Sequence, residues 1–432
     1  MTTSDADVGA RLRALRTGQG LTQRELAGDR YTTAFVSSIE AGRRQPSSDA
    51  LEHFANQLGV DPEVLRDGRP STAVLELALA EARHTQAVGD TTLAREQIDE
   101  VLGLAIEHEL PVLRSQALVA LGFWALRSGD VRGSLAHYEE AEKLLVDQPE
   151  PARALAVAGQ ARCLRILGDV RRSVMVVERA LDELERAGLP DPLALMVLHA
   201  QAVPAYMDLG LSRKAEAAAE TALGLAAQVP DPLRQADMYR AVARGFLDGN
   251  RVPQARQAVA RAQELYDQLD LRTDVGHCYW ARGWIYEHSA TANLASARRQ
   301  LETARQIFIE TGSRFDEGLV TVELADIVRR LGAFDRARAL IADIQDYPEV
   351  VALPGAYAEV ERCLGLIAAD EGEYPRALTH LERAIALFRQ AEELLHEART
   401  YRHLGDVRSA AGDADGATRA YRDGLTALDR VS

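Results

Sequence analysis

The chain has 432 residues, of which 47% are hydrophobic and 5% aromatic, and its formal net charge at pH 7 is −15. This length and apolar content predict two to three ordinary domains or one elongated array, and they exclude collagen-like and disordered chains. The acidic balance excludes a protein whose whole surface coats nucleic acid or an anionic membrane.

The first part of the chain departs from this acidic balance. Between residues 8 and 46 there are seven arginines against Glu25, Asp29 and Glu40, which gives this segment a net charge of +4. We therefore expect a small basic domain at residues 1–70, followed by a long acidic body at residues 71–432.

Several short helices are predicted in the basic domain, because its sequence contains recognisable start and stop signals. Val8–Thr17 places Leu12 and Leu15 on one face. A second helix follows Thr22, which forms a capping box with Glu25. The third is expected at residues 32–40 before Gly42, the fourth begins at Ser47 and stops at Gly59, and Asp61–Pro62 opens a last turn.

These residues resemble the Xre/Cro-type helix-turn-helix of bacterial and phage repressors. The similarity covers about sixty residues and includes the motifs LTQRELA, VSSIEAGRRQPS and ALEHFANQLGV. The stretch GDRYTT between the second and third helices is one residue shorter than the usual form. The resemblance implies a five-helix domain that binds DNA, and it implies that Arg16 and Glu40 form an internal ion pair.

In a helix-turn-helix the second helix of the motif enters the major groove. If Val36 and Ile39 are buried, the side chains that face outward are those of Thr33, Ala34, Ser37 and Ser38. Their hydroxyl groups can hydrogen-bond to either type of base, and the methyl groups of Ala34 and Thr33 suit a thymine methyl. Gln23, Arg43 and Arg44 are placed for phosphate or base-edge contacts. The alternative is a protein-binding helical domain with an ordinary polar face. The candidate DNA-contacting residues are Gln23, Thr32, Thr33, Ala34, Ser37, Ser38, Arg43 and Arg44.

The acidic body repeats with a spacing of 39 to 42 residues. Helical stretches are expected to end at Gly89, Gly129, Gly168, Gly210, Gly249, Ala290, Gly332, Gly372 and Gly412. Most of these turns have a small residue seven positions earlier, at Ala82, Gly122, Ala161, Gly283, Ala325, Gly365 and Gly405. Small residues at a constant offset allow paired helices to pack closely.

This pattern resembles a tetratricopeptide array of about nine helix pairs, so the whole chain is predicted to be all-α. The period of about 40 residues, against the usual 34, implies helices roughly one turn longer. Proline is expected to start four first helices, at Pro111, Pro151, Pro192 and Pro232. The pattern is broken around residues 289–291. The resemblance implies a superhelix whose first helices line a concave surface that binds a partner.

Two tryptophans are the candidate ligand residues of this surface. Trp280 and Trp284 lie one helical turn apart and form either a ligand platform or part of the packing between repeats. Tyr279 and Tyr286 fall on ordinary core positions. Arginines on first helices are expected to be ion-paired or solvated, although some could meet an anionic ligand; these are Arg162, Arg165, Arg240, Arg244, Arg362 and Arg402.

Regulators that resemble this combination often bind signalling peptides through asparagines. The body has only Asn250 and Asn293, which weakens the peptide interpretation, although glutamines could substitute for them, such as Gln116, Gln160 and Gln201. A small molecule is the alternative effector.

No enzyme motif occurs in the sequence: HExxH, GxxxxGK[ST] and GxSxG are all absent. The three cysteines form no CxxC pair and the histidines no i,i+4 pair, so we expect no metal, cofactor or catalytic residue. The N-terminus resembles no secretion signal, and no apolar run approaches the ~18 residues of a membrane helix, so a cytoplasmic protein without a membrane partner is expected.

The sequence thus predicts a homodimeric transcriptional regulator that binds double-stranded operator DNA and whose repeats sense a peptide or small molecule. The alternative is an interaction scaffold whose helix-turn-helix serves assembly instead of DNA binding.

Overall fold

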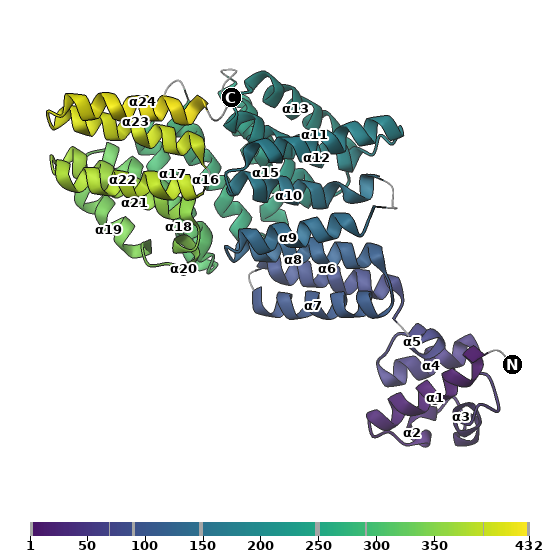
Figure 1. Cartoon of the computed structure of the whole chain (residues 1–432). Coiled ribbons are helices and arrows are strands. Elements are labelled where there is room, and N and C mark those ends of the chain that lie inside the picture. Colours follow the sequence, from purple (N-terminus) through teal and green to yellow (C-terminus); the bar gives the residue numbers. More distant parts are fainter. Residues whose placement is uncertain are drawn as a thin grey trace. The chain divides into compact units, whose positions relative to one another are not determined.

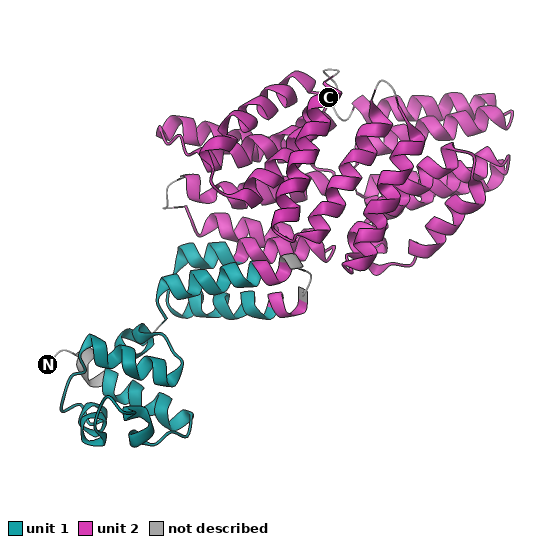
Figure 2. Cartoon of the chain, turned by 180° about the vertical axis from the view of Figure 1, so that it is seen from behind, with its two compact units in different colours: residues 1–83, 96–117 teal, residues 84–95, 118–432 magenta. Residues whose placement is uncertain are grey.

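The computed structural model describes residues 3–68, 70–88, 91–146, 150–246, 251–289, 292–391 and 393–429. Every regular element in these ranges is a helix, which confirms the predicted all-α fold (Figure 1). Two compact units are distinguished, one of residues 1–83 with 96–117 and one of residues 84–95 with 118–432 (Figure 2). The predicted boundary at residue 70 falls inside the first unit and stays a prediction. Within the ranges given, every helix is too short or too polar to cross a lipid bilayer.

The basic domain contains the five predicted helices. They are α1 (Thr3–Gly18), α2 (Gln23–Ala27), α3 (Thr33–Glu40), α4 (Ser48–Leu58) and α5 (Pro62–Asp67). The first helix begins at Thr3, earlier than the predicted Val8. The predicted start signals are confirmed, since Thr22 and Glu25 form the capping box of α2 and Ser47 caps α4.

The core of this domain is an apolar cluster contributed by all five helices. Leu12, Leu26, Val36, Phe54 and Leu65 are all fully buried in it. Helices α1 and α3 approach closely at Gly9, where a Cβ atom would overlap the carbonyl oxygen of Ile39. The position of α3 is therefore fixed by packing on its inner side.

The rest of the chain consists of successive helix pairs, nine of them within the described ranges. The first helices are α6 (Thr72–Val88), α8 (Pro111–Arg127), α10 (Ala154–Ile166), α12 (Pro192–Asp208), α14 (Pro232–Val242), α16 (Arg272–His288), α18 (Arg314–Arg330), α21 (Pro354–Asp370) and α23 (Leu394–Ala410). The second helices are α7 (Thr91–Glu107), α9 (Val131–Lys143), α11 (Val170–Ala187), α13 (Ser212–Leu225), α15 (Val252–Gln268), α17 (Leu294–Glu310), α19 (Phe334–Ile344), α22 (Tyr374–Gln390) and α24 (Ala414–Asp429).

Short helices interrupt this pattern at four places. A 3-10 turn, η1 (Glu150–Arg153), precedes α10, and η2 (Ala226–Gln228) follows α13. Another 3-10 turn, η3 (Ala243–Phe246), extends α14, and α20 (Pro348–Val351) lies between α19 and α21. Many of the regular helices have 17 residues, in agreement with the prediction from the long period.

The predicted turn glycines that lie in the described ranges are confirmed. Six of them have a φ between 71° and 86°, a left-handed conformation that favours glycine: Gly129, Gly168, Gly210, Gly332, Gly372 and Gly412. The other predicted turn residues, Gly89, Gly249 and Ala290, lie outside the described residues, as do Asn250 and Thr291.

Proline starts three of the four first helices for which it was predicted. Pro111, Pro192 and Pro232 each begin an α-helix. The prediction for Pro151 is wrong, because this residue lies in the 3-10 turn η1 and α10 begins only at Ala154. Proline fixes φ for both kinds of helix, so it does not by itself select the α form.

The small residues of the repeat permit close contact within helix pairs. A Cβ atom at Gly122 would lie 2.8 Å from the ring of Tyr138, and one at Gly283 would lie 2.7 Å from Leu301. The same ring of Tyr138 would be overlapped by a Cβ atom at Gly159. Tyr138 is therefore held between glycines of α8 and α10.

Candidate DNA interface and ligand surface

The predicted DNA-contacting residues of α3 lie on the side of the helix that faces away from the core. Thr32, Thr33 and Ala34 are exposed, and Ser37 and Ser38 are partly exposed. Val36 and Ile39 are buried on the opposite side, at 0% and 1% exposure. Thr32 caps α3 through its hydroxyl, which accepts from the amide of Phe35 at 3.2 Å. The arrangement presents hydroxyl and methyl groups together at the N-terminal end of α3.

The two arginines that follow α3 extend this surface with positive charge. The amides of Arg43 and Arg44 both donate to the carbonyl of Ser38, at 2.9 and 3.2 Å, so the chain turns tightly after the helix. The guanidinium of Arg44 lies over the ring of Phe35, 4.7 Å from its centroid. Stacking orients the guanidinium but leaves its N–H donors available to an anion such as phosphate.

Gln23 has a structural contact that sequence reasoning missed. Its Nε2 donates to Oε2 of Glu40 at 2.8 Å, which connects the start of α2 to the end of α3. The amide nitrogen of this residue is thus engaged within the domain. No local pattern could have revealed this hydrogen bond, since it joins residues on different helices.

The ion pair implied by the resemblance, between Arg16 and Glu40, is confirmed. Nε of Arg16 donates to Oε1 of Glu40 at 2.6 Å, and its second terminal nitrogen donates to Oε2 at 3.0 Å. A third bond reaches the carbonyl of Leu21 at 2.7 Å. The two side chains are only 11% and 4% exposed. Such a two-point contact fixes α3 relative to α1 and the α1–α2 connection.

The pair also perturbs the titration of Glu40. Burial alone would raise the pKa of the Glu40 carboxyl, but the hydrogen bonds from Arg16 and Gln23 outweigh it and lower the pKa below 4.5. A carboxyl whose pKa is lowered by folding contributes stability above its unfolded pKa. That contribution is lost as the pH falls through the lower, folded-state value.

We expect Arg16→Ala to destabilise the basic domain by about 3 kcal/mol, because it leaves a buried carboxylate without its partner. An exposed pair would contribute at most ~1 kcal/mol. Hydrogen exchange of the α1–α3 amides in the full chain measures this change in stability. The part of the stability that is lost at acidic pH because Glu40 is protonated should be absent in the Glu40→Ala variant. Unchanged exchange protection combined with lost DNA binding would contradict this role and make Arg16 a direct DNA contact.

In the repeat array, the two predicted ligand tryptophans contact different neighbours. Nε1 of Trp280 donates to Oε2 of Glu323 at 2.7 Å, and its ring meets the ring of Phe308 edge-on. Trp284 stacks on His288 with ring centroids 4.5 Å apart, and the guanidinium of Arg244 lies 4.6 Å from its ring. These contacts agree with the packing alternative, and a role in ligand binding stays a prediction.

Glu323 provides a pH-dependent probe of this region. Burial raises its pKa to about 7, an effect that the hydrogen bond from Trp280 reduces and the nearby charge of Glu287 increases. Because folding raises this pKa, the contribution of Glu323 to stability is complete below about 4.5 and is lost as the pH rises through about 7.

We therefore expect tryptophan fluorescence to titrate with a midpoint near pH 7 as Glu323 ionises beside the Trp280 indole. Trp124→Phe with Trp284→Phe isolates the signal of Trp280, and Glu323→Gln in that background should abolish the transition. A midpoint near the ordinary glutamate value, or a transition that persists in the Glu323→Gln variant, would contradict the assignment.

Of the six first-helix arginines named from the sequence, four form ion pairs, as predicted. Asp208 lies 3.2 Å from both Arg165 and Arg244. Arg240 lies 3.9 Å from Asp237, and Arg362 pairs with Glu359. Arg162 and Arg402 form neither an ion pair nor a hydrogen bond with any residue in the described ranges. Burial lowers the pKa of the partly exposed Arg162 guanidinium, and the nearby positive charge of Arg240 lowers it further.

The second unit also contacts itself between helices distant in sequence. The ring of Phe315, at the start of α18, is 5% exposed and belongs to one apolar cluster with side chains of α8, α9 and α10, namely Leu126, Val131, Tyr138 and Cys163. Close by in the array, Arg127 lies 3.6 Å from Asp274. A Cβ atom at Gly168 would lie 2.6 Å from Glu393. We call the Phe315 cluster the closing contact of the array.

Two segments of the chain match known protein families. Residues 7–67 match the helix-turn-helix domain, and residues 357–430 match the tetratricopeptide repeat. The chain carries a helix-turn-helix domain and tetratricopeptide repeats. The comparison with curated protein sequences found no match for this chain.

Solved structures show the same helical-repeat fold. A Rap protein complexed with competence and sporulation factor is 14% identical, with a TM-score of 0.59 over 83% of this chain and 99% of that one. The apo form of the quorum sensor NprR from B. thuringiensis is also 14% identical, with a TM-score of 0.51 over 82% and 99% of the two chains. At these identities the similarity establishes the fold of the tetratricopeptide repeats and nothing more specific.

Proposed function

We propose that this protein is a transcriptional regulator that acts by binding and without catalysis. Its helix-turn-helix domain, residues 1–70, binds operator DNA through α3, and its tetratricopeptide repeats, residues 71–432, sense an effector and mediate homodimerisation. The observation that carries the proposal is the exposed polar face of α3, fixed from behind by Arg16, Glu40 and Gln23 within a domain that matches the helix-turn-helix family.

In this proposal the N-terminal end of α3 lies against base edges in the major groove. Thr32, Thr33, Ala34, Ser37 and Ser38 supply hydroxyl and methyl groups, which suit either base type and the thymine methyl. Arg43 and Arg44, together with the remaining atoms of Gln23, contact phosphates, which position the domain without reading sequence.

We propose a homodimer because the surface of one helix-turn-helix domain that contacts bases is small. One helix-turn-helix reads only a few base pairs, and related motifs gain specificity from two half-sites about one helical turn apart. We therefore propose a roughly palindromic operator. Since residues 71–432 are acidic, phosphate repels the repeats and only the basic domain approaches DNA closely.

The proposed effector acts on the curvature of the repeats. The similar Rap protein was solved with competence and sporulation factor, and NprR is named a quorum sensor, so a peptide or small molecule on the first helices is the kind of effector we propose. Small rotations between repeats add up along such an array. A change in curvature would strain the closing contact at Phe315 and alter the spacing of the two DNA-binding domains.

Binding of the full chain to the upstream region of its own gene tests the proposal. We expect a complex that survives excess nonspecific DNA and weakens steeply between about 50 and 200 mM salt, as phosphate contacts require. The competing interpretation is a scaffold whose helix-turn-helix serves assembly. If nonspecific competitor DNA displaced the chain from the operator as readily as specific competitor DNA does, the result would favour the scaffold and overturn the proposal of a regulator.

A further inference from the structure

One side of α24, the last helix in the described ranges, carries three large side chains that remain exposed. Their positions i, i+4 and i+7 place them on one side of the helix. They are Tyr421, Leu425 and Leu428, with exposed fractions of 38%, 64% and 41%. We call these three residues the open face of α24. Neighbouring apolar side chains that are exposed together mark a surface for another protein element.

The preceding repeat shows what ordinarily happens to these positions. A Cβ atom at Gly405 would lie 2.3 Å from the ring of Tyr421, and one at Gly365 would lie 2.9 Å from Leu381, so residues 40 positions apart are equivalent in the two helix pairs. The equivalents of the open face on α22 are at most 5% exposed; they are Leu381, Ile385 and Phe388. The same positions are therefore buried in one repeat and exposed in the next.

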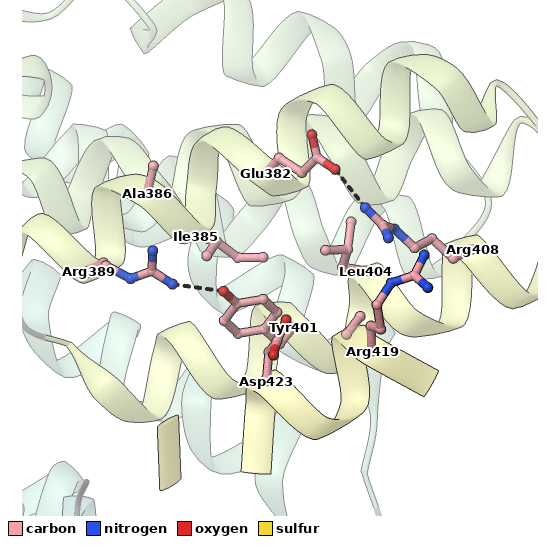
Figure 3. Close-up of a pocket in the computed structure, with 10 residues that line it drawn as sticks. Glu382, Ile385, Ala386, Arg389, Tyr401, Leu404, Arg408, Arg419 and Asp423 are labelled. Atoms are coloured by element: carbon pink, nitrogen blue, oxygen red, sulfur yellow. Dashed lines mark hydrogen bonds and ion pairs between the residues drawn. The ribbon is translucent and has the colours of Figure 1, made fainter. Parts of the chain in front are cut away.

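The difference arises because α23 packs on α22. Ile385 belongs to one apolar cluster with Leu404 of α23 and lines a pocket with it (Figure 3). The ring of Phe388 lies 5.4 Å from that of His396, also on α23. Within the described ranges no further helix packs on α24 in this way. Its open face is thus a surface for packing between repeats, and a helix is the element that fits it.

Charges of opposite sign border the open face. Arg422 and Asp429 are both exposed, and they lie three positions before and four positions after Leu425. When two identical helices pair in antiparallel direction about a two-fold axis, residues at similar distances on either side of the axis lie opposite each other. An axis at Leu425 therefore brings Arg422 of each copy to the partner's Asp429. The same axis places Tyr421 opposite the partner's Leu428.

We propose that the open face is the homodimer contact of the repeats, on which a second copy of the chain packs its own α24 in antiparallel direction. The choice of a second copy rests on the proposed homodimer and on the self-complementary order of apolar and charged residues around Leu425. A two-fold contact closes after two copies, so a dimer and no larger assembly is expected. One helix pair gives an interface at or below the low end of the usual range of about 1,200–2,000 Å², which corresponds to a dissociation constant of roughly 1–10 μM.

Sedimentation equilibrium of the full chain without DNA tests the contact, at concentrations from about 0.5 to 50 μM, which bracket the expected dissociation constant. The variants Leu425→Glu and Leu77→Glu form a matched pair. Both change an exposed leucine, since Leu77 of α6 is 61% exposed, but only Leu425 lies on the open face. Leu425→Glu places two carboxylates against each other at the axis and should weaken the dimer at least about 100-fold. Leu77→Glu should leave it within about threefold of the unmodified chain.

A mixing experiment tests the antiparallel register. Arg422→Glu and Asp429→Arg each place like charges opposite each other, so each variant alone should dimerise about tenfold more weakly. In an equimolar mixture, the glutamate introduced at position 422 faces the arginine introduced at position 429 of the other copy. The unmodified Arg422 and Asp429 of the two variants also face each other. With one variant fluorescently labelled, the mixed dimer should form within about twofold of the unmodified affinity. Equal thermal midpoints would show that all variants are folded.

Four results would overturn this assignment. They are a chain that stays monomeric at every concentration, assemblies larger than a dimer, equal weakening by Leu425→Glu and Leu77→Glu, and no recovery on mixing the two charge variants. The proposed regulation fails separately, because these measurements contain no DNA. A chain that dimerises through α24 without binding its operator would refute the regulator alone, and a monomeric chain that binds its operator would refute the α24 contact alone.

Discussion

Replacement of Ser37 and Ser38 together by glutamate is expected to abolish specific DNA binding by the full chain. Both side chains are partly exposed on α3, so two carboxylates there would face phosphates and the acceptor-rich edges of the bases. We expect affinity for the operator to fall at least ~10³-fold, to the level of nonspecific binding or below. Fluorescence anisotropy with a labelled operator measures the loss. Glutamate is a good helix former, so α3 itself should persist.

The matched control adds the same two charges elsewhere in the domain. Asn56→Glu with Gln57→Glu places them on exposed positions of α4, where they change the net charge equally without altering α3. This control should weaken binding only modestly, through long-range repulsion that salt screens. If the α3 variant kept its specific affinity, or if both variants lost it equally, α3 would not be the DNA-reading helix.

Substitution of Gly159 by alanine is expected to destabilise the second unit, although alanine favours a helix by about 1 kcal/mol relative to glycine. Gly159 lies inside α10, and a methyl group there would overlap the ring of Tyr138, which is 5% exposed and held on its other side by Gly122. Overpacking of this kind costs about 1–3 kcal/mol. Urea unfolding followed by circular dichroism should therefore show a lower midpoint.

Gly224→Ala is expected to have the opposite effect and to stabilise the same unit. Gly224 lies inside α13, and a Cβ atom there would have no neighbour within 4 Å. Alanine should stabilise α13 by about 0.5–1 kcal/mol through the lower entropy of the unfolded chain. Stabilisation by both substitutions would mean that Tyr138 moves freely between the two helices, and it would refute the close packing proposed for the small residues of the repeat.

The local features of this chain could be predicted from the sequence alone. The helices of the basic domain were located by caps such as Thr22 with Glu25, whose hydrogen bonds join residues three positions apart. The turn glycines and the small residues seven positions before them located the helix pairs, because both act within one pair. Pro151 is the exception, because the fixed φ of proline fits both an α-helix and a 3-10 helix and does not by itself select the α form.

Part of the candidate site could also be predicted from neighbouring residues in the sequence. Once Val36 and Ile39 were assigned to the core, the period of the helix determined which side of α3 faces outward. The Arg16–Glu40 pair was found through resemblance, since nothing in the spacing of these two residues points to a contact. The sequence did not predict the hydrogen bond from Gln23 to Glu40. Nor did it predict that Trp280 and Trp284 contact different neighbours.

Contacts between distant repeats were decided only by the tertiary structure. The closing contact joins Phe315 to helices more than a hundred residues earlier. It depends on how each helix is rotated against the next. In a repeat array each such rotation is small and is set by the neighbouring helices. The sum of the rotations decides whether distant repeats come into contact. No single segment of the sequence determines that sum.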